Sequence, residues 1–526
     1  MPTSRLCLRP QNESPHSQVW DHAQLEAGLL VSSQYGLCAA AGSGPCGSRG
    51  FCLSNALGSH MVLQREPQAA ALWGFAPPGD DVDCLLVSTG QEARVVADAG
   101  GAWALTLPPQ PAGGPHDIVC SSRLRPDASE TLQDVLFGDV YLCGGQSNMV
   151  FATRAMLNGT DEVAAADAFP DIRLFSVGQS TPRPPAPGVP LQQLGTLEQP
   201  WARASAGSVA GFSAVCWVAG RALHARLGGS VPLGLVVSAW GGTTLQQWAP
   251  SDAVLRGCSQ APGHGVRFEA MIAPLLPMRL SGVLFYQGET NVGSDSAAAC
   301  PGRGPETYAC LFPAVIAGWR AAFQAPDLFF AFVQLSPYSP YACRRQAGRL
   351  ALPRLRAAQL VALILERTAM VTAIDLGDAD SPYRDVHPRV KAPIGERLAA
   401  VLAARVYNMP GVPHRSPVFE SAVLSQSAVT VAFRADTCGG GLVVRPEPAC
   451  PAALEADMCA GWELQAGDGS WFAASAAAAG PHSVTVSAAE LHGDAPVTVR
   501  YAYANYPLVS LFSGQGWPAL PLLAQL

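Results

Sequence analysis

The sequence carries little charge and no long hydrophobic run. Only 14 % of its 526 residues are charged, although 49 % are hydrophobic. Its longest apolar runs are interrupted by Gly, Pro, Arg or His before they reach the roughly 18 residues that a membrane-spanning helix needs. The net charge of −7 comes without an Arg/Lys-rich stripe or tail. We therefore expect no membrane span, and no binding of nucleic acid, whose phosphates attract basic surfaces.

Cysteine patterns typical of metal sites are also missing. None of the 15 cysteines forms a C-x-x-C motif, and no Cys/His cluster has zinc-finger spacing. Structural zinc is therefore not expected. Cys300 and Cys310 flank one loop, and Cys438, Cys450 and Cys459 crowd another, as expected if some of them pair in an oxidising compartment. The odd total leaves at least one cysteine unpaired.

The N-terminus and the glycosylation motifs indicate different compartments. Residues 1–50 are irregular and rich in Ser, Gly and Pro, and they lack the basic start, apolar stretch and cleavage site of a signal peptide. Taken as written, this N-terminus predicts a cytoplasmic protein, unless it is an alternative or mis-assigned translation start. Asn-x-Ser/Thr triplets at Asn12 and Asn158 are compatible with secretion.

The length predicts two or three domains. Short apolar segments alternate with Pro/Gly turns up to Val135, which predicts a small antiparallel β domain. Strands and helices then alternate, which predicts a mostly parallel sheet covered on both faces. From about Ser416 the β pattern returns. The predicted regions are an irregular leader (1–50), an N-terminal β-rich domain (51–134), an α/β domain (135–412) and a C-terminal β-rich region (413–526).

Within the α/β region the periodicity of apolar residues predicts individual elements. The helices are 214–227, 312–323 and 392–407, and the strands are 135–143, 233–238, 282–286, 328–335 and 369–375. Functional groups in such sheets gather beyond the carboxyl ends of the strands. The loops that leave these ends are 144–148, 238–244, 287–291 and 375–388.

Ser147 is the first candidate for chemistry. It follows two glycines and Gln146, where a strand turns sharply and the backbone can present a hydroxyl with little cover. Taken alone, a serine in this place more often caps the next helix. The G-x-S-x-G elbow is absent, because Met149 occupies the position of its last glycine.

A serine nucleophile needs a base, and His387 is the best candidate among the ten histidines. It lies between a predicted strand and a predicted helix, with a carboxylate two residues away. Asp385 could accept the imidazole N–H and fix the tautomer, as the third member of a triad does. Alternatively, Asp385 only pairs with Arg384 or Arg389.

Two further loops offer hydrogen-bond donors for an oxyanion. Gly241 and Gly242 present unobstructed N–H groups, and Gln287 offers a side-chain amide. Glu289 could hold the loop of Gln287 in place. Each loop taken alone is more often a turn than a site, and it is the convergence of four such loops that favours an acyl-transfer site.

At this point a family likeness is visible. The motifs Gly145-Gln-Ser-Asn-Met149, Trp240-Gly-Gly-Thr243, Tyr286-Gln-Gly-Glu-Thr-Asn291 and His387-Pro388 together resemble those of the SGNH-type carbohydrate esterases that act on O-acetylated sialic acids. The likeness runs from about residue 55 to about residue 510. Such an ordered set of motifs is very specific.

The resemblance implies hydrolysis of O-acetyl esters on sialic acids, such as the 9-O-acetyl group, through an acetyl-enzyme. The products are acetate and free sialic acid, no metal or organic cofactor is expected, and the compartment is the lysosome or the cell exterior. By motif, Ser147 is the nucleophile and His387 the base. The oxyanion donors are Gly241 or Gly242 and Gln287 beside the Ser147 N–H, and the supporting residues are Asn148 and Glu289.

One departure from the family pattern leaves alternatives open. SGNH enzymes commonly place the triad Asp three residues before His, but Arg384 stands there and the carboxylate belongs to Asp385. A Ser-His dyad supported by a backbone carbonyl, or by Asp378 or Asp380, is the alternative. For the function, the alternatives are an esterase of another sugar ester such as acetylxylan, and a non-catalytic glycan-binding protein that uses the β-rich regions.

Overall fold

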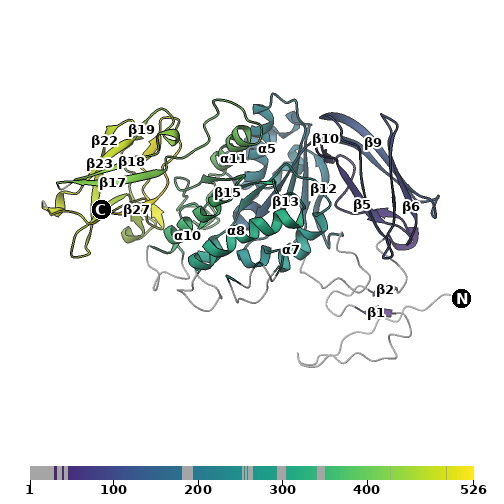
Figure 1. Cartoon of the computed structure of the whole chain (residues 1–526), viewed down its shortest axis with the longest axis horizontal. Helices are drawn as coiled ribbons and strands as arrows, with labels where there is room; N and C mark the ends of the chain where they lie inside the picture. Colours follow the sequence, from purple (N-terminus) through teal and green to yellow (C-terminus); the bar gives the residue numbers. More distant parts are fainter. Residues whose placement is uncertain are drawn as a thin grey trace.

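The computed structural model describes residues 29–31, 38–40, 46–179, 193–251, 254, 257–258, 265–292, 304–340, 350–426, 428–492 and 494–526. Asn12, Cys300 and most of the predicted leader lie outside the described residues. In Figure 1 a β-rich region, an α/β region and a second β-rich region follow one another along the long axis, in chain order. The predicted fold class is therefore confirmed.

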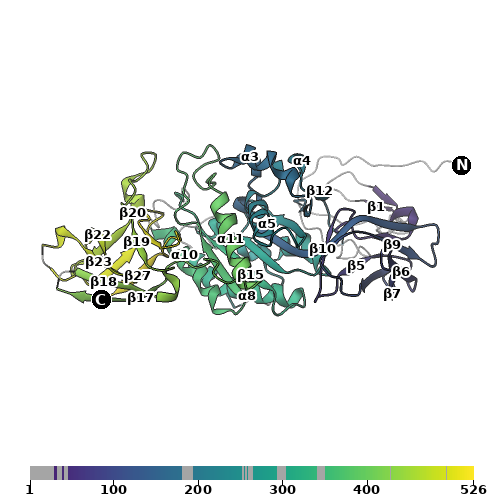
Figure 2. The same ribbon diagram turned by 90° about the horizontal axis from the view of Figure 1, so that it is seen from above.

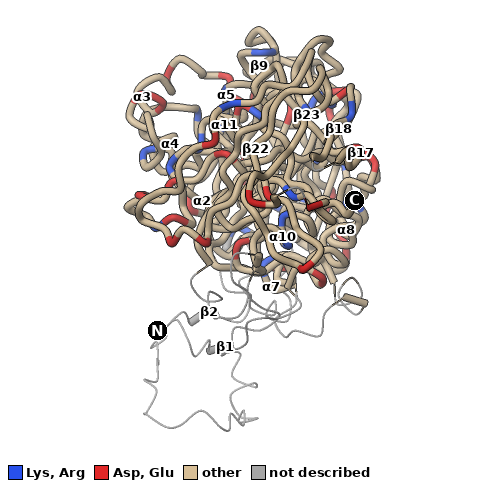
Figure 3. The backbone as a smooth tube through the Cα atoms, turned by 90° about the vertical axis from the view of Figure 1, so that its left-hand side faces the viewer, with Lys and Arg blue, Asp and Glu red and all other residues tan. Residues whose placement is uncertain are grey.

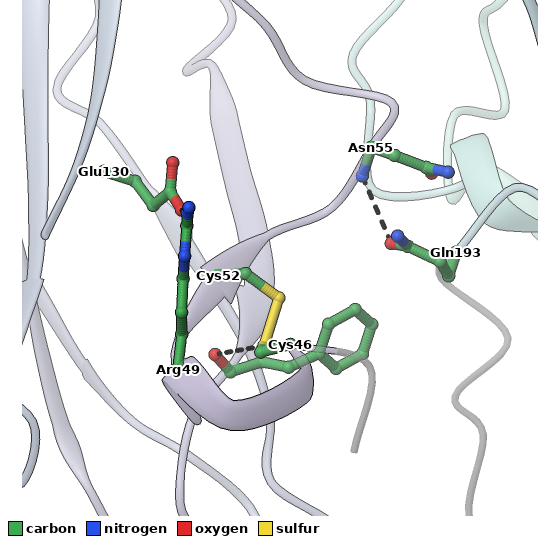
Figure 4. Close-up of a disulfide and its surroundings, with 7 residues drawn as sticks. Cys46, Arg49, Cys52, Asn55, Glu130 and Gln193 are labelled. Carbon is green, nitrogen blue, oxygen red and sulfur yellow. Dashed lines mark hydrogen bonds and ion pairs between the residues drawn. A yellow bond between two sulfur atoms is a disulfide. The ribbon is translucent and has the colours of Figure 1, made fainter. Parts of the chain in front are cut away.

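The first region is built of short, mostly antiparallel strands. Its strands are β3 (Cys52–Leu53), β4 (Val62–Gln64), β5 (Ala71–Phe75), β6 (Asp81–Leu86), β7 (Gln91–Val96), β8 (Ala102–Thr106) and β9 (Gly113–Ser122). A disulfide between Cys46 and Cys52 closes the segment that leads into β3, and Arg49 in that segment pairs with Glu130 (Figure 4). These strands lie within residues 51–134, for which the sequence predicted a small antiparallel β domain.

One long strand, β10 (Ser129–Gly145), connects the first region to the second. Its first half pairs antiparallel with β9, with Leu132 opposite Ile118. Its second half pairs in parallel with β13 (Leu233–Ala239), with Asp139 opposite Leu233. The boundary expected at residue 134/135 therefore falls inside a continuous strand, and the two regions share one hydrophobic core.

The α/β region is centred on a sheet with the strand order β12-β11-β13-β10-β14-β15-β16. All pairs are parallel except the edge pair of β11 and β12. The remaining bounds are β11 (Ile172–Val177), β12 (Leu197–Arg203), β14 (Gly282–Tyr286), β15 (Phe329–Gln334) and β16 (Thr368–Thr372). Because the carboxyl ends of parallel strands lie at one edge, the loops after β10, β13, β14 and β16 come together there.

Helices cover both faces of this sheet (Figures 1 and 2). On one face α5 (Ala214–Arg226) packs beside α11 (Ala392–Arg405). On the other lie α7 (Val266–Met271), α8 (Gly304–Ala322) and α10 (Ala351–Leu360). The short helices α2 (Ser147–Val150), α3 (Gly159–Ala164) and α4 (Ala206–Ala210) occupy the loops. The three predicted helices are present, and α8 begins before the position expected from the sequence.

The C-terminal region has a seven-stranded sheet and a hydrophobic core of its own. The sheet order is β17 (Phe419–Ser425), β18 (Ala428–Phe433), β23 (Ser483–Ser487), β22 (Trp471–Gly480), β21 (Trp462–Gln465), β24 (Thr498–Tyr501) and β27 (Leu522–Gln525). Short pairs add β19 (Leu442–Val444) with β26 (Leu511–Ser513) and β20 (Cys459–Ala460) with β25 (Tyr506–Pro507).

Five disulfides join cysteines of the described residues: Cys46–Cys52, Cys84–Cys120, Cys143–Cys216, Cys258–Cys310 and Cys450–Cys459. Cys438 is buried and free. Within the described ranges no helix is long and apolar enough to span a bilayer. Basic and acidic residues are interspersed along the backbone drawn in Figure 3.

Candidate active site

Ser147 lies where the central strand β10 gives way to α2. The turn requires a glycine just before it, because a Cβ on Gly145 would lie 2.1 Å from the carbonyl oxygen of Tyr286. Ser147 is the first residue of α2, and the N-cap is Gln146. The helix-capping interpretation of Ser147 is therefore wrong. Within the described part of the chain no hydrogen bond engages its hydroxyl, so the group is free to react.

Ser147 and His387 line the same pocket, which has a volume of about 540 Å³. Gly241 and Trp240, from the loop after β13, line it as well. His387 belongs to the loop that leads from β16 to α11. The structure thus brings together residues that are 240 positions apart in the sequence (147 to 387).

The imidazole of His387 is oriented by a backbone carbonyl. Its Nδ1 lies 2.8 Å from the carbonyl oxygen of Tyr383. Because a carbonyl only accepts, Nδ1 carries the proton and Nε2 is left as the basic nitrogen. Partial burial lowers the pKa of His387, the Lys391 and Arg384 cations lower it further, and the hydrogen bond to Tyr383 opposes them.

Asp385 does not hold the histidine. Its Oδ2 accepts a hydrogen bond from the Ser339 amide at 2.7 Å, and its Oδ1 is buried with no hydrogen-bond partner among the described residues. The role of triad acid expected for Asp385 is thus not supported by this geometry. The physical reason is the turn that precedes His387, in which Arg384 has a φ of 73° and the His387 N–H donates to the Arg384 carbonyl. This turn brings a carbonyl, not the carboxylate, to the ring.

Of the two other acids considered on this loop, Asp380 is exposed to solvent and Asp378 is occupied by another partner. Asp378 forms an ion pair with Arg389, at 2.6 Å between Oδ2 and Nε. The Arg389 guanidinium keeps the pKa of Asp378 below its usual value. Among the alternatives stated for the sequence, the geometry therefore favours a histidine supported by a backbone carbonyl.

The Gly241 backbone lies against Ser147. A Cβ on Gly241 would lie 3.3 Å from the Ser147 Cβ and 4.0 Å from the Ser147 amide nitrogen. Among the described groups, none accepts a hydrogen bond from the Ser147 or the Gly241 N–H. Both amides are therefore available as oxyanion donors. Gly242 has a φ of 73° and shapes the turn without lining the pocket.

Gln287 faces the protein interior. Its side chain is buried, and its Nε2 lies 2.8 Å from Asn291 Oδ1, 3.1 Å from the Thr243 carbonyl and 3.2 Å from Gln146 Oε1. An amide has only two N–H groups, so these acceptors occupy both of them. The expectation that Gln287 donates to the oxyanion is not met, because the residue ties the loops after β10, β13 and β14 together.

Asn148, next to the nucleophile, is the centre of a buried polar network. Its Nδ2 donates to Glu289 Oε1 and to the Val386 carbonyl, the latter at 2.9 Å. Its Oδ1 accepts from Lys391 Nζ at 2.5 Å. Burial raises the pKa of Glu289 and lowers the pKa of Lys391 to about 7. Asn148 and Glu289 thus lie where they can support the loops around Ser147. The participation of Lys391 in this network was not predicted.

The pocket also contains two charged side chains that the sequence motifs did not reveal. Arg154, in a 3-10 turn (Thr153–Ala155), and Glu198, on β12, are both exposed and line the pocket with Ser147. Across the described ranges neither of them forms an ion pair. Neither residue belongs to one of the four loops at the strand ends, and so no positional signal in the sequence marked them.

Comparison with known proteins identifies the family. The profile of the family described as "Carbohydrate esterase, sialic acid-specific acetylesterase" matches residues 137–404, just over half of the chain. The chain belongs to this family of carbohydrate esterases. It is a carboxylic ester hydrolase, and the alternative of a non-catalytic glycan-binding protein is set aside.

Individual relatives of this esterase cover most of its length. The sialate O-acetylesterase of Rattus norvegicus is 31 % identical over 70 % of this chain and 76 % of its own. That of Homo sapiens is 29 % identical over 87 % of this chain and 88 % of its own. A crystal structure of a carbohydrate acetylesterase from Xanthomonas citri superposes with a TM-score of 0.75 at 29 % identity, covering 90 % of this chain and 99 % of that one.

Proposed function

We propose that this esterase removes O-acetyl groups from sialic acids, with Ser147 as the nucleophile and His387 as the general base. The observation that carries the assignment of these residues is that Ser147, His387 and Gly241 line one pocket. The relatives named as sialate O-acetylesterases support the choice of substrate. The acetyl ester enters this pocket.

The reaction proceeds in two steps. His387 Nε2 takes the Ser147 proton as the hydroxyl oxygen attacks the acetyl carbonyl, while the Tyr383 carbonyl holds Nδ1–H. The N–H groups of Ser147 and Gly241 stabilise the oxyanion, and His387 returns the proton to the sugar oxygen as it leaves. Water then attacks the acetyl-enzyme by the same route, which releases acetate.

The substrate class draws support from one more residue in the pocket. Sialic acids carry a carboxylate, ionised at neutral pH, that the xylose units of acetylxylan lack. Arg154 is the only Arg or Lys among the residues described as lining this pocket. A guanidinium binds a carboxylate with two parallel hydrogen bonds. Arg154 is thus the group that selects an acidic sugar over a neutral one.

Release of acetate from 9-O-acetylated sialic acid tests the function. Loss of a general base costs on the order of 10²- to 10⁴-fold, so Ser147→Ala and His387→Ala are both expected to lose useful activity. Both variants should keep the thermal unfolding temperature of the parent within a few degrees. A variant with near-normal turnover would refute the residue assignments.

Comparison with acetylxylan tests the substrate class. The parent should prefer the sialate, and Arg154→Ala should lower kcat/KM for the sialate by about tenfold or more, because a charged hydrogen bond is lost. The same variant should leave kcat/KM for acetylxylan or a neutral acetyl-ester dye unchanged. Equal loss on all substrates would argue against a carboxylate contact at Arg154.

We also propose that the protein folds in an oxidising compartment, on the way to the lysosome or the cell exterior. The five disulfides of the described residues support this, because such bonds persist where thiols are not kept reduced. Asn158 is exposed and open to glycosylation. Protein from cultured cells should lose mass on N-glycosidase treatment, and Asn158→Gln should remove that change. Recovery of unglycosylated protein from the cytosol would contradict this proposal.

A further inference from the structure

Lys391 is the only lysine in the 526-residue sequence, since every other basic side chain except histidine is an arginine. It is also completely buried, with an exposed fraction of 0 %. Burying an ammonium group is costly unless strong partners compensate it. A chain that uses arginine everywhere else therefore has a specific use for a lysine at this one place.

The partners of Lys391 lead directly to the nucleophile. Its Nζ donates to Asn148 Oδ1 at 2.5 Å, and Asn148 is the neighbour of Ser147. The same Nζ lies 4.9 Å from the centre of the Phe151 ring and 5.7 Å from that of the Tyr286 ring. Rings at these distances stabilise a cation. Arginine would need room for a planar fork, whereas the lysine places a compact charge at a single atom.

The charges around Asn148 permit only one orientation of its amide. The carbonyl end faces the ammonium of Lys391, which only donates. The NH2 end faces two acceptors, Glu289 Oε1 and the Val386 carbonyl. A flipped amide would place its oxygen against both acceptors and its NH2 against the ammonium. Lys391 thus fixes the direction in which Asn148 donates.

This single amide holds the segment that carries the base at two points. Asn148 contacts Val386, immediately before His387, and Lys391, four residues after it. Val386 and Lys391, which lie on either side of His387, are therefore both tied to Asn148, the residue after Ser147. Within the described network, no other side chain of α2 forms hydrogen bonds with this segment at two places.

We propose that Lys391 is a positioning residue that, through Asn148, sets the distance between the Ser147 hydroxyl and the His387 imidazole. This inference rests on the proposed function, because it requires that these two groups react together. Lys391 itself touches neither the substrate nor the reacting atoms. Burial lowers the pKa of Lys391 to about 7, while Glu289 and Asp378 raise it in part.

The first test is a double-mutant cycle with an acetyl-ester dye as the substrate. Lys391→Met keeps the length of the side chain but removes the donor. We expect kcat to fall on the order of a hundredfold, the loss typical of a misplaced reacting group, with KM within about twofold of the parent. Since Lys391 acts through Asn148, the variant with both Lys391→Met and Asn148→Ala should be no slower than Asn148→Ala alone.

Arg500→Met is the matched control. Arg500 is a buried cation on β24, and its Nε lies 2.7 Å from Glu463 Oε2. It belongs to the C-terminal region, which contributes none of the described residues that line the pocket. Its loss should lower the thermal unfolding temperature but leave kcat unchanged. The inference would be overturned if Lys391→Met left kcat unchanged, or lowered it no more than the control does. It would also be overturned if the effects of Lys391→Met and Asn148→Ala on kcat multiplied in the double variant.

A second measurement needs no variant and remains decisive if Lys391→Met fails to fold. Selective isotope labelling of lysine gives a single side-chain NMR signal, because the sequence has one lysine. Reaction of Ser147 with a fluorophosphonate should shift this signal, because a displacement at Ser147 moves Asn148 and so alters its hydrogen bond with Lys391. An unshifted signal would overturn the inference. A parent protein that releases no acetate would instead refute the proposed function.

Discussion

His387 Nδ1 donates to the Tyr383 carbonyl oxygen at 2.8 Å, in the place where a catalytic triad has a carboxylate. A carbonyl fixes the tautomer and the ring direction, but it brings less negative charge to the imidazolium that forms during the reaction. The arrangement is therefore a serine-histidine pair with a neutral support. Asp385 stabilises the neighbouring backbone through Ser339.

The first prediction concerns Asp385. We expect Asp385→Asn to lower kcat by less than about tenfold, because Asn can still accept a hydrogen bond from the Ser339 amide through its oxygen, whereas loss of a true triad acid costs about 10⁴-fold. Steady-state kinetics with an acetyl-ester dye measures the change. A drop of a thousandfold or more, with the unfolding temperature preserved, would show that Asp385 supports the base after all.

The second prediction concerns the pH profile. His387 must be neutral to accept a proton, and burial lowers its pKa from the ordinary value of 6.5. A lowered pKa keeps the base neutral at more acidic pH, so kcat/KM should rise with pH and level off with an apparent pKa below 6.5. Rates measured from acidic to neutral pH give this value. An apparent pKa above 6.5 would require a negative group beside the ring.

The third prediction concerns the oxyanion donor on the loop after β13. In Gly241→Ala the new Cβ would lie 3.3 Å from the Ser147 Cβ, closer than such contacts usually are. We expect the Gly241 N–H to move away from the oxyanion and kcat to fall by about tenfold or more, with little change in stability. Gly242→Ala is the control, since its cost is mainly backbone strain at a φ of 73° and should appear in thermal unfolding.

The sequence predicted those parts of the site that depend on short motifs at strand ends. Ser147, His387 and Gly241 each follow a predicted strand, and parallel strands deliver such residues to one edge of the sheet. The support of His387 could not be chosen from the sequence, because every residue has a backbone carbonyl and only the turn at Arg384 selects that of Tyr383. The sequence could therefore name the base but not its partner.

Long-range packing accounts for what the sequence did not reveal. Gln287 was expected to face the pocket, but acceptors from three loops hold its amide in the interior. Lys391 meets Asn148 across 243 residues, a contact that local periodicity cannot reveal. The unpredicted helix α10 contains Pro353, which weakens the helical signal. Its buried face becomes evident only when it packs against α8.

Covalent labelling of Ser147 tests the central claim most directly. A fluorophosphonate should attach to the parent protein at Ser147, as located by mass spectrometry of its peptides, because only an activated hydroxyl attacks phosphorus at a useful rate. Labelling should be abolished in Ser147→Ala and slowed on the order of 10²-fold or more in His387→Ala. Labelling at a different residue, or labelling of Ser147 at the same rate without His387, would contradict the account.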